Sequence, residues 1–164
     1  MSYAVYSTRG FILGSAPTGE ASKIYLIYTE DFGLVRARAQ SVRLLVSKLR
    51  YNLEDYSFGT FSLVRGREIW RLTGTEKIDL PQKQKFSLVR ARVLNLIKRL
   101  VQGEEKNEKL FKTLLSVTEK EMSEPFILAH ILDALGYLDV KKLSEMDEKQ
   151  IIQAVNKALK ETHL

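Results

Sequence analysis

The chain has 164 residues, of which 45% are hydrophobic and 28% charged, which is enough to bury the core of one domain or of two small ones. No apolar run reaches the roughly 18 residues that cross a bilayer, and the N-terminus lacks the basic start and apolar core of a secretory signal. Without cysteine there is no disulfide framework or thiolate zinc site, so a reducing cytoplasm is expected. The net charge of +6 favours anionic partners.

The first half of the chain has the pattern of a small β-structure. Short segments rich in β-branched and aromatic side chains predict five strands, at residues 3–13, 23–29, 34–39, 56–64 and 68–74. Glycine and proline mark residues 14–19 as a loop, and Glu30-Asp31-Phe32-Gly33 is short enough to form a hairpin between the second and third strands. Residues 41–55 fit either a helical turn or a loop.

The third predicted strand carries the most informative charge pattern. Arg36 and Arg38 lie two residues apart, so on a strand both project from the same face. The sequence continues with Arg43, Lys48 and Arg50, and no acidic residue occurs between Phe32 and Leu53 to neutralise them. This predicts a sheet surface that presents several cations to an anionic ligand.

Five short strands with a long connection between the third and fourth are typical of a closed barrel. The OB-fold is the expected fold, since it is a five-stranded barrel whose face and loops bind oligonucleotides; an SH3-like barrel is the alternative. From Pro81 the apolar period becomes helical. Helices are predicted over residues 86–101, 107–122 and 126–135, the third with Ser123 as N-cap, and a last one begins within 144–147. The fold class is therefore α+β, with an OB-fold domain over residues 1–80 and an α-helical domain, packed on the barrel, over 81–164.

Catalytic motifs are absent from the sequence. It contains no phosphate-binding GxxxxGK[ST], no HExxH and no paired cysteines, and Gly10 and Gly14 precede no helix. His130 lies among apolar residues and is more often a packed histidine than a base, while His163 stands next to the end of the chain. We therefore expect a protein that is not an enzyme and has no cofactor or metal.

Binding has more support, because cations attract phosphates and aromatic rings stack on unpaired bases. Trp70 is a candidate for stacking, although a core tryptophan is an equally good interpretation. The candidate nucleic-acid-binding residues are Arg9, Arg36, Arg38, Arg43, Lys48, Arg50, Arg65, Arg67, Arg71 and Trp70. Arg90, Arg92, Lys98 and Arg99 form a second basic block, which either extends the groove or covers the solvent face of its helix. Scattered solubilising charges are the simpler alternative for all of them.

Several segments resemble the RecO family of recombination mediators. They are YSTRGFIL at residues 6–13, GEA at 19–21, YTEDFGLVRARA at 28–39, SKLR at 47–50 and ILDALGY at 131–137. The resemblance implies an OB-fold followed by a helical domain. It also implies a non-catalytic function: binding single- and double-stranded DNA, annealing complementary strands and loading recombinase, at the nucleoid.

Family partners implied by the resemblance are RecR and the C-terminal tail of the single-stranded-DNA-binding protein. Its DNA contacts map onto Arg9, Arg36, Arg38 and the segment with Lys48 and Arg50. Many members carry a four-cysteine zinc module after the LGY helix and exceed 200 residues. This sequence has no cysteine, so we expect a short form without zinc. A protein adaptor that recruits an acidic peptide without DNA, and an RNA-binding OB-fold, are the alternatives.

Overall fold

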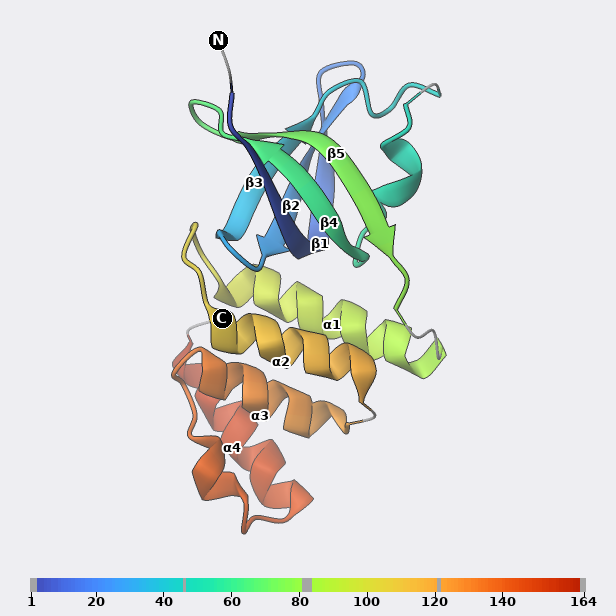
Figure 1. Cartoon of the computed structure of the whole chain (residues 1–164). Coiled ribbons are helices and arrows are strands. Elements are labelled where there is room, and N and C mark those ends of the chain that lie inside the picture. Colours follow the sequence, from blue (N-terminus) through green and yellow to red (C-terminus); the bar gives the residue numbers. More distant parts are fainter. Residues whose placement is uncertain (1–2, 46, 81–83, 121, 163–164) are drawn as a thin grey trace. The chain divides into compact units, whose positions relative to one another are not determined.

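The computed structural model describes residues 3–45, 47–80, 84–120 and 122–162 and contains a five-stranded barrel and a set of helices (Figure 1). Two compact units divide the chain. One comprises residues 1–80 with 101–106, and the other comprises 81–100 with 107–164. The return of residues 101–106 to the barrel unit is not anticipated by a division after residue 80. His163 lies outside the described residues.

The five strands close on themselves in the order β1-β2-β3-β5-β4. They are β1 Val5–Thr18, β2 Ser22–Thr29, β3 Gly33–Ala39, β4 Phe58–Val64 and β5 Trp70–Ile78. All neighbouring pairs are antiparallel except β3 and β5, which pair in parallel and close the barrel. The predicted α+β class and the five-stranded OB-type barrel are confirmed.

The predicted loop at residues 14–19 is wrong, because β1 continues through it as far as Thr18. In this stretch β1 pairs only with β2, since its pairing with β4 ends at Phe11. Pro17 has no amide hydrogen to donate, and no described strand lies on its β4 side that would accept one. The turn is shorter than expected and lies at Gly19, which has φ +59°.

The two other differences lie after β3. Residues 41–55 fit either a helical turn or a loop by sequence; the described ones, 41–45 and 47–55, are irregular apart from a 3-10 turn, η1, at Arg50–Asn52. β5 runs to Ile78, four residues beyond its predicted end, because its second half continues the antiparallel ladder with β4.

The barrel interior is filled by alternating side chains. On β3, Val35, Ala37 and Ala39 are fully buried. They join a core cluster that includes Tyr25 and Trp70. On β3 the alternation buries one side of the strand and leaves the other free for charged groups.

The helices of the second unit are α1 Gln84–Leu100, α2 Glu108–Glu119, α3 Glu124–Ala134 and α4 Glu148–Glu161, with a short 3-10 turn η2 at Val140–Leu143. The four predicted helices are confirmed to within a few residues. Asn107 caps α2 by accepting a hydrogen bond from the Leu110 amide, and Asp147 forms a capping box with Gln150 on α4. Ser123 occupies the predicted N-cap of α3 but forms no side-chain cap.

Candidate nucleic-acid interface

The outer face of β3 presents the two predicted arginines. Arg36 and Arg38 are exposed, while the alternate residues between and around them are buried, as the period of two requires. On β2, Leu26 pairs with Arg36 and Ile24 pairs with Arg38. Both apolar neighbours are half-buried, so the guanidinium groups rise from a partly apolar sheet surface.

A third arginine joins this surface from the strand on the other side. The parallel ladder between β3 and β5 places Arg71 directly opposite Arg38, and both side chains are exposed. Arg36, Arg38 and Arg71 thus form a cationic patch on β3 and β5, bordered on β2 by the apolar residues Ile24 and Leu26. The sequence alone does not reveal the Arg38–Arg71 pairing, because a parallel contact between strands more than thirty residues apart leaves no local signal.

An open groove of about 740 Å³ begins at this pair. Its lining residues are Arg38, Gln40, Gly66, Arg67, Glu68, Ile69, Arg71, Leu72 and Thr73. Arg67 comes from the β4–β5 connection, where the sequence predicts cations at a turn. Three guanidinium groups and one carboxylate, that of Glu68, therefore surround the groove.

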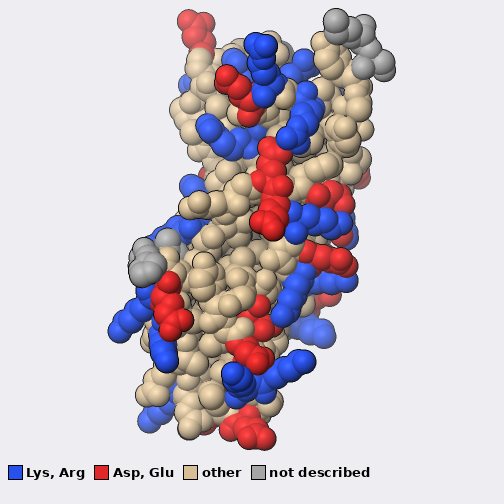
Figure 2. Space-filling model, turned by 90° about the vertical axis from the view of Figure 1, so that its left-hand side faces the viewer, with Lys and Arg blue, Asp and Glu red and all other residues tan. Residues whose placement is uncertain are grey.

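Charge on this part of the barrel is not neutralised by ion pairs. Arg36, Arg38, Arg67 and Arg71 form no ion pair with any carboxylate that the structure describes. Figure 2 shows basic side chains gathered on the barrel around a smaller number of acidic ones. An exposed guanidinium group without an internal partner is available to a phosphate, which it contacts with a planar fork of donors.

The other cations predicted to follow Arg36 and Arg38 lie in the segment between β3 and β4. Arg43, Lys48 and Arg50 are all exposed. The Arg43 backbone amide donates to the Ala21 carbonyl at 2.9 Å, and its guanidinium donates to the Gly19 carbonyl at 3.4 Å. The segment is thereby fixed to the β1–β2 turn, and Arg43 is held at that end of the barrel.

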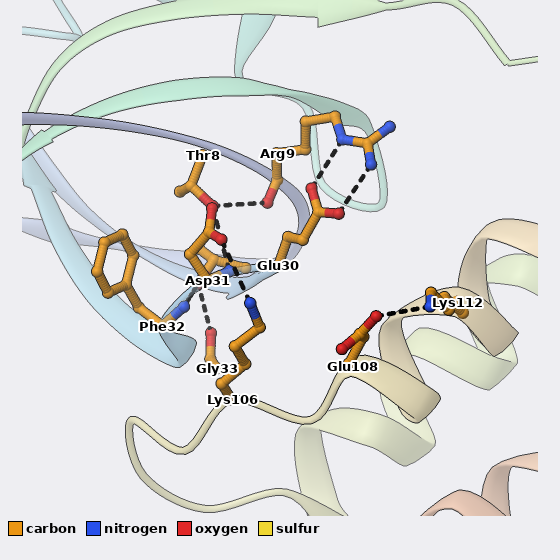
Figure 3. Close-up of polar contacts among 10 residues, drawn as sticks. Thr8, Arg9, Glu30, Asp31, Phe32, Gly33, Lys106, Glu108 and Lys112 are labelled. Carbon is orange, nitrogen blue, oxygen red and sulfur yellow. Dashed lines mark hydrogen bonds and ion pairs between the residues drawn. The ribbon is translucent and has the colours of Figure 1, made fainter.

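Arg9 is engaged within the protein. Its guanidinium donates two hydrogen bonds of 2.8 Å to the Glu30 carboxylate, across the β1–β2 ladder (Figure 3). That hydrogen bond is the main reason why the pKa of Arg9 lies above its ordinary value. The expectation that Arg9 contacts DNA is therefore weakened, because its positive charge already faces a carboxylate.

Contacts of Thr8, Asp31 and Gly33 fix the β2–β3 hairpin next to Arg9 and Glu30. The Thr8 hydroxyl donates to Asp31 at 2.7 Å, and the Lys106 ammonium lies 3.7 Å from the same carboxylate (Figure 3). Gly33 has φ +66°, and a Cβ atom there would stand 2.3 Å from the Glu105 carbonyl oxygen. Glycine is required by both the turn and the close approach of residues 101–106. Much of the YTEDFG segment thus serves the architecture of the barrel.

Trp70 does not act as an exposed stacking residue, since only 2% of its surface is accessible. Its indole Nε1 donates to Glu104 at 3.0 Å, and its ring contacts Tyr6 and Phe32 at centroid distances of 5.7 and 5.0 Å. The core interpretation of this tryptophan is the one that the structure supports. A buried indole needs a partner for its N–H, and the returning segment 101–106 supplies it.

Arg65 is engaged by the same cluster. Its guanidinium lies over the Trp70 ring, 4.8 Å from the centroid, and forms an ion pair of 2.9 Å with Glu104. Its predicted contact with nucleic acid is therefore weakened as well, because cation–π and ion-pair contacts hold the side chain against the barrel.

The second basic block belongs to α1 and is less uniform than its sequence indicates. Arg92 forms an ion pair of 2.8 Å with Glu124, whereas Lys98 and Arg99 are exposed near the C-terminal end of the helix. Arg90 is half-buried, burial lowers its pKa, and its Nε atom has no hydrogen-bond partner among the described residues. At the end of α1, Lys98 and Arg99 also stabilise the helix dipole.

The histidine and carboxylate groups of the helical unit form no metal-holding cluster in the described ranges. His130 is half-buried on α3, and no group of three His, Asp or Glu side chains in that part of the chain could hold a metal ion. Asp133 is an ion-pair residue: the Lys109 ammonium lies 2.7 Å from it, and that hydrogen bond is the largest cause of its lowered pKa. In the same described residues, no helix combines the length and apolarity that a membrane span requires.

The fold and the patch together define a class of protein. A closed five-stranded barrel in the order β1-β2-β3-β5-β4 is an OB-fold, and the outer face of its β3 and β5 carries arginines that form no ion pair with a described carboxylate. Residues 1–81 match the family model described as "Recombination protein O N terminal". The chain belongs to the RecO family.

Curated relatives extend the similarity beyond the barrel. The chain is 30% identical over 143 residues to a DNA repair protein RecO from Dehalococcoides mccartyi, covering 80% of this chain and 56% of that relative. A DNA repair protein RecO from Rubrobacter xylanophilus is 39% identical over 75 residues, covering 46% of this chain and 30% of the relative. One from Alkaliphilus metalliredigens is 27% identical over 124 residues, covering 71% and 50%. The chain thus spans about half the length of the first and third of these relatives and less of the second.

Proposed function

We propose that the chain is a DNA-binding protein of repair and recombination, and that its barrel holds DNA by its phosphates without covalent chemistry. The observation that carries this proposal is the cross-strand pair Arg38–Arg71 at the edge of the 740 Å³ groove. Two guanidinium groups in register on adjacent strands suit the repeating charge of a polyphosphate. The names of the relatives support the same assignment.

Strand annealing is part of the proposal. Two complementary strands repel each other as polyanions, and a surface that neutralises phosphates lowers that repulsion while leaving base edges free to pair. The patch fits this role because no ion pair with a described carboxylate holds Arg36, Arg38 or Arg71 in place. No acid, base or nucleophile is needed for this function, and the protein is accordingly proposed not to be an enzyme.

The direct test is DNA binding followed by fluorescence anisotropy at two salt concentrations, with single-stranded and duplex probes. Charge reversal at Arg36 and Arg38 should weaken binding to DNA of any sequence and reduce its dependence on salt. Lys149→Glu/Lys157→Glu on α4 is the matched control, since it changes the net charge equally at two exposed sites. Equal affinity of wild type and the Arg36/Arg38 variant would place the interface elsewhere, and no binding by the wild type would reject the function.

Recombinase loading and contacts with RecR and the acidic tail of the single-stranded-DNA-binding protein complete the proposal. They rest on membership of the family, and the chain spans only part of its relatives. Isothermal titration with purified RecR and with a synthetic tail peptide measures them separately from DNA binding. A chain that binds DNA but neither partner would retain the first half of the proposed function and lose the second.

A further inference from the structure

A second cavity lies on the barrel unit, apart from the groove beside Arg71. It has a volume of about 360 Å³, and its lining residues are Lys23, Tyr25, Val42, Arg43, Arg50 and Leu53. Three cations and no carboxylate line it. Its size lies at the lower end of the range of small-ligand sites. The cavity therefore suits a small anionic group with an apolar part.

The alternation of β2 explains why a lysine reaches this cavity. Lys23 stands two residues before the buried Tyr25, so both side chains lie on the inner side of the strand. At the beginning of β2, Lys23 pairs with Ala39 and Pro17 and is half-buried. A cation on the inner side of a barrel strand is costly to bury, and its position at the strand end allows the ammonium to reach the opening.

The other walls come from the segment between β3 and β4, which is anchored at both ends. Ser41 donates its backbone amide to the Ser22 hydroxyl, and Val42, which is 2% exposed, enters the barrel core. At the far end of the segment, the side-chain amide of Asn52 donates to the Thr75 carbonyl at 3.4 Å, and Leu53 is 6% exposed. The cations of this segment are thus placed by a framework that packs into the barrel.

An exposed aromatic side chain adjoins this cavity in the chain. Tyr51 follows the cavity residue Arg50 and is 71% exposed, in contrast to Trp70 at 2%. Burying so much aromatic surface against a ligand is favourable, and a nucleobase offers a matching flat face. Because Arg50 and Tyr51 are consecutive, their Cα atoms are about 3.8 Å apart, so a strand whose phosphate enters the cavity passes close to Tyr51.

We propose that Lys23, Arg43 and Arg50 bind a phosphate of single-stranded DNA in this cavity while Tyr51 stacks on an unpaired base of the same strand. The site rests on the proposed DNA-binding function and adds to it a preference for single strands. A duplex keeps its bases stacked inside, so it can offer the phosphate but not the base. An acidic peptide offers carboxylates without a flat base, which makes it the poorer match for Tyr51.

The first experiment compares Tyr51→Ala and Tyr51→Phe by anisotropy with oligodeoxythymidylate and with a duplex. Tyr51→Ala should lower affinity for the single strand by about 5- to 150-fold, the loss expected for one stacked base, and leave duplex affinity unchanged. Tyr51→Phe keeps the ring and should retain wild-type binding. The side chain is exposed, so neither variant should unfold the barrel.

The second experiment tests the cavity itself. Lys23→Gln should reduce the slope of log affinity for oligodeoxythymidylate against log salt by about 0.7, the value for one phosphate contact of a single strand. Lys149→Gln on α4 is the control and should leave the slope unchanged. Circular dichroism of Lys23→Gln checks that β2 is retained.

A reporter distinguishes the possible ligands. Tyr51→Trp keeps an aromatic face at an exposed site, and its indole should be quenched by oligodeoxythymidylate but not by a duplex or a polyglutamate peptide. Tyr137→Trp, at an exposed position beyond α3, is the control and should not be quenched. Quenching by the peptide alone would assign the cavity to a protein partner and overturn the inference.

The remaining outcomes separate this inference from the proposed function. If the wild type binds no DNA, both are wrong. If the wild type binds DNA and charge reversal at Arg36 and Arg38 weakens it, while Tyr51→Ala and Lys23→Gln bind as the wild type does, the function stands and the cavity site is wrong. Loss of single-strand affinity in Tyr51→Ala with duplex affinity retained supports both.

Discussion

The salt dependence of DNA binding gives the sharpest test of the cationic patch. The perturbation is the double variant Arg38→Ala/Arg71→Ala. These residues are opposed in register on β3 and β5, and neither forms an ion pair with a described carboxylate. Both side chains are exposed, so their truncation removes charge and little packing. The variant should therefore report on the ligand contacts of this pair.

The magnitude follows from counterion release. Two lost phosphate contacts should reduce the slope for single-stranded DNA by about 1.4 and the slope for duplex DNA by about 1.8. With the affinities taken as equal at 1 M salt, where counterion release contributes nothing, the affinity for a single strand should then fall about 25-fold at 0.1 M, about 10-fold at 0.2 M and about 3-fold at 0.5 M. The loss that shrinks as salt rises is the signature of phosphate contacts, because a folding defect would weaken binding at every salt concentration.

The assay is fluorescence anisotropy with a labelled single strand across this range of salt. The control is Arg9→Ala/Arg65→Ala, which removes the same charge from two arginines that are already paired with Glu30 and Glu104. The control should change the slope by much less than the Arg38/Arg71 variant. Equal changes in the two double variants would show that net charge decides binding, and the reasoning from the register of β3 and β5 would be refuted.

Three further predictions concern the framework. Trp70→Phe removes the hydrogen bond to Glu104 and should lower the free energy of unfolding, measured by urea titration, by about 1–3 kcal/mol. Its DNA affinity should stay unchanged. A large loss of affinity in the folded variant would show that Trp70 stacks on DNA after all. Gly33→Ala should destabilise the barrel, by about 1–3 kcal/mol for the strained backbone and more where the new methyl group meets Glu105; a variant as stable as the wild type would contradict the close approach. The pKa of Asp133 is lowered, mainly by its hydrogen bond with Lys109. The charged carboxylate therefore stabilises the fold fully above the ordinary aspartate pKa of about 3.9. This stabilisation is lost as the pH falls through the lower pKa of the folded state. Asp133→Asn should accordingly flatten the acid limb of the urea midpoint between pH 5 and 2, and an unchanged limb would argue against the ion pair.

The sequence predicts best where one local period decides the outcome. The alternation from Leu34 to Ala39 places Arg36 and Arg38 on the outer face, and the structure confirms it. The continuation of β1 through Pro17 could not be read in this way, because it depends on the end of the β4 pairing at Phe11. The strand order, and with it the position of Arg71, is likewise a property of the closed barrel.

Charge in sequence is a poor guide to charge that is free in the structure, because pairing depends on residues far away. Arg9 and Arg65, like Arg38, have no acidic residue directly beside them in the sequence, yet the fold brings Glu30 beside one and Glu104 beside the other. Glu104 reaches Arg65 only because residues 101–106 return to the barrel unit. The same return buries the indole of Trp70.

Burial also separates the aromatic residues that the sequence could not rank. Trp70 and Tyr51 both lie beside arginines, but the parity of β5 places Trp70 in the barrel core, in the same cluster as Tyr25 and Phe61. Tyr51 belongs to a 3-10 turn whose residues are not buried, so its ring is left at the surface. An aromatic residue with a core position is fixed by packing, whereas one without such a position is free to meet a ligand. Under the proposed function, an exposed aromatic residue such as Tyr51 is the kind that can stack on a base of the bound strand.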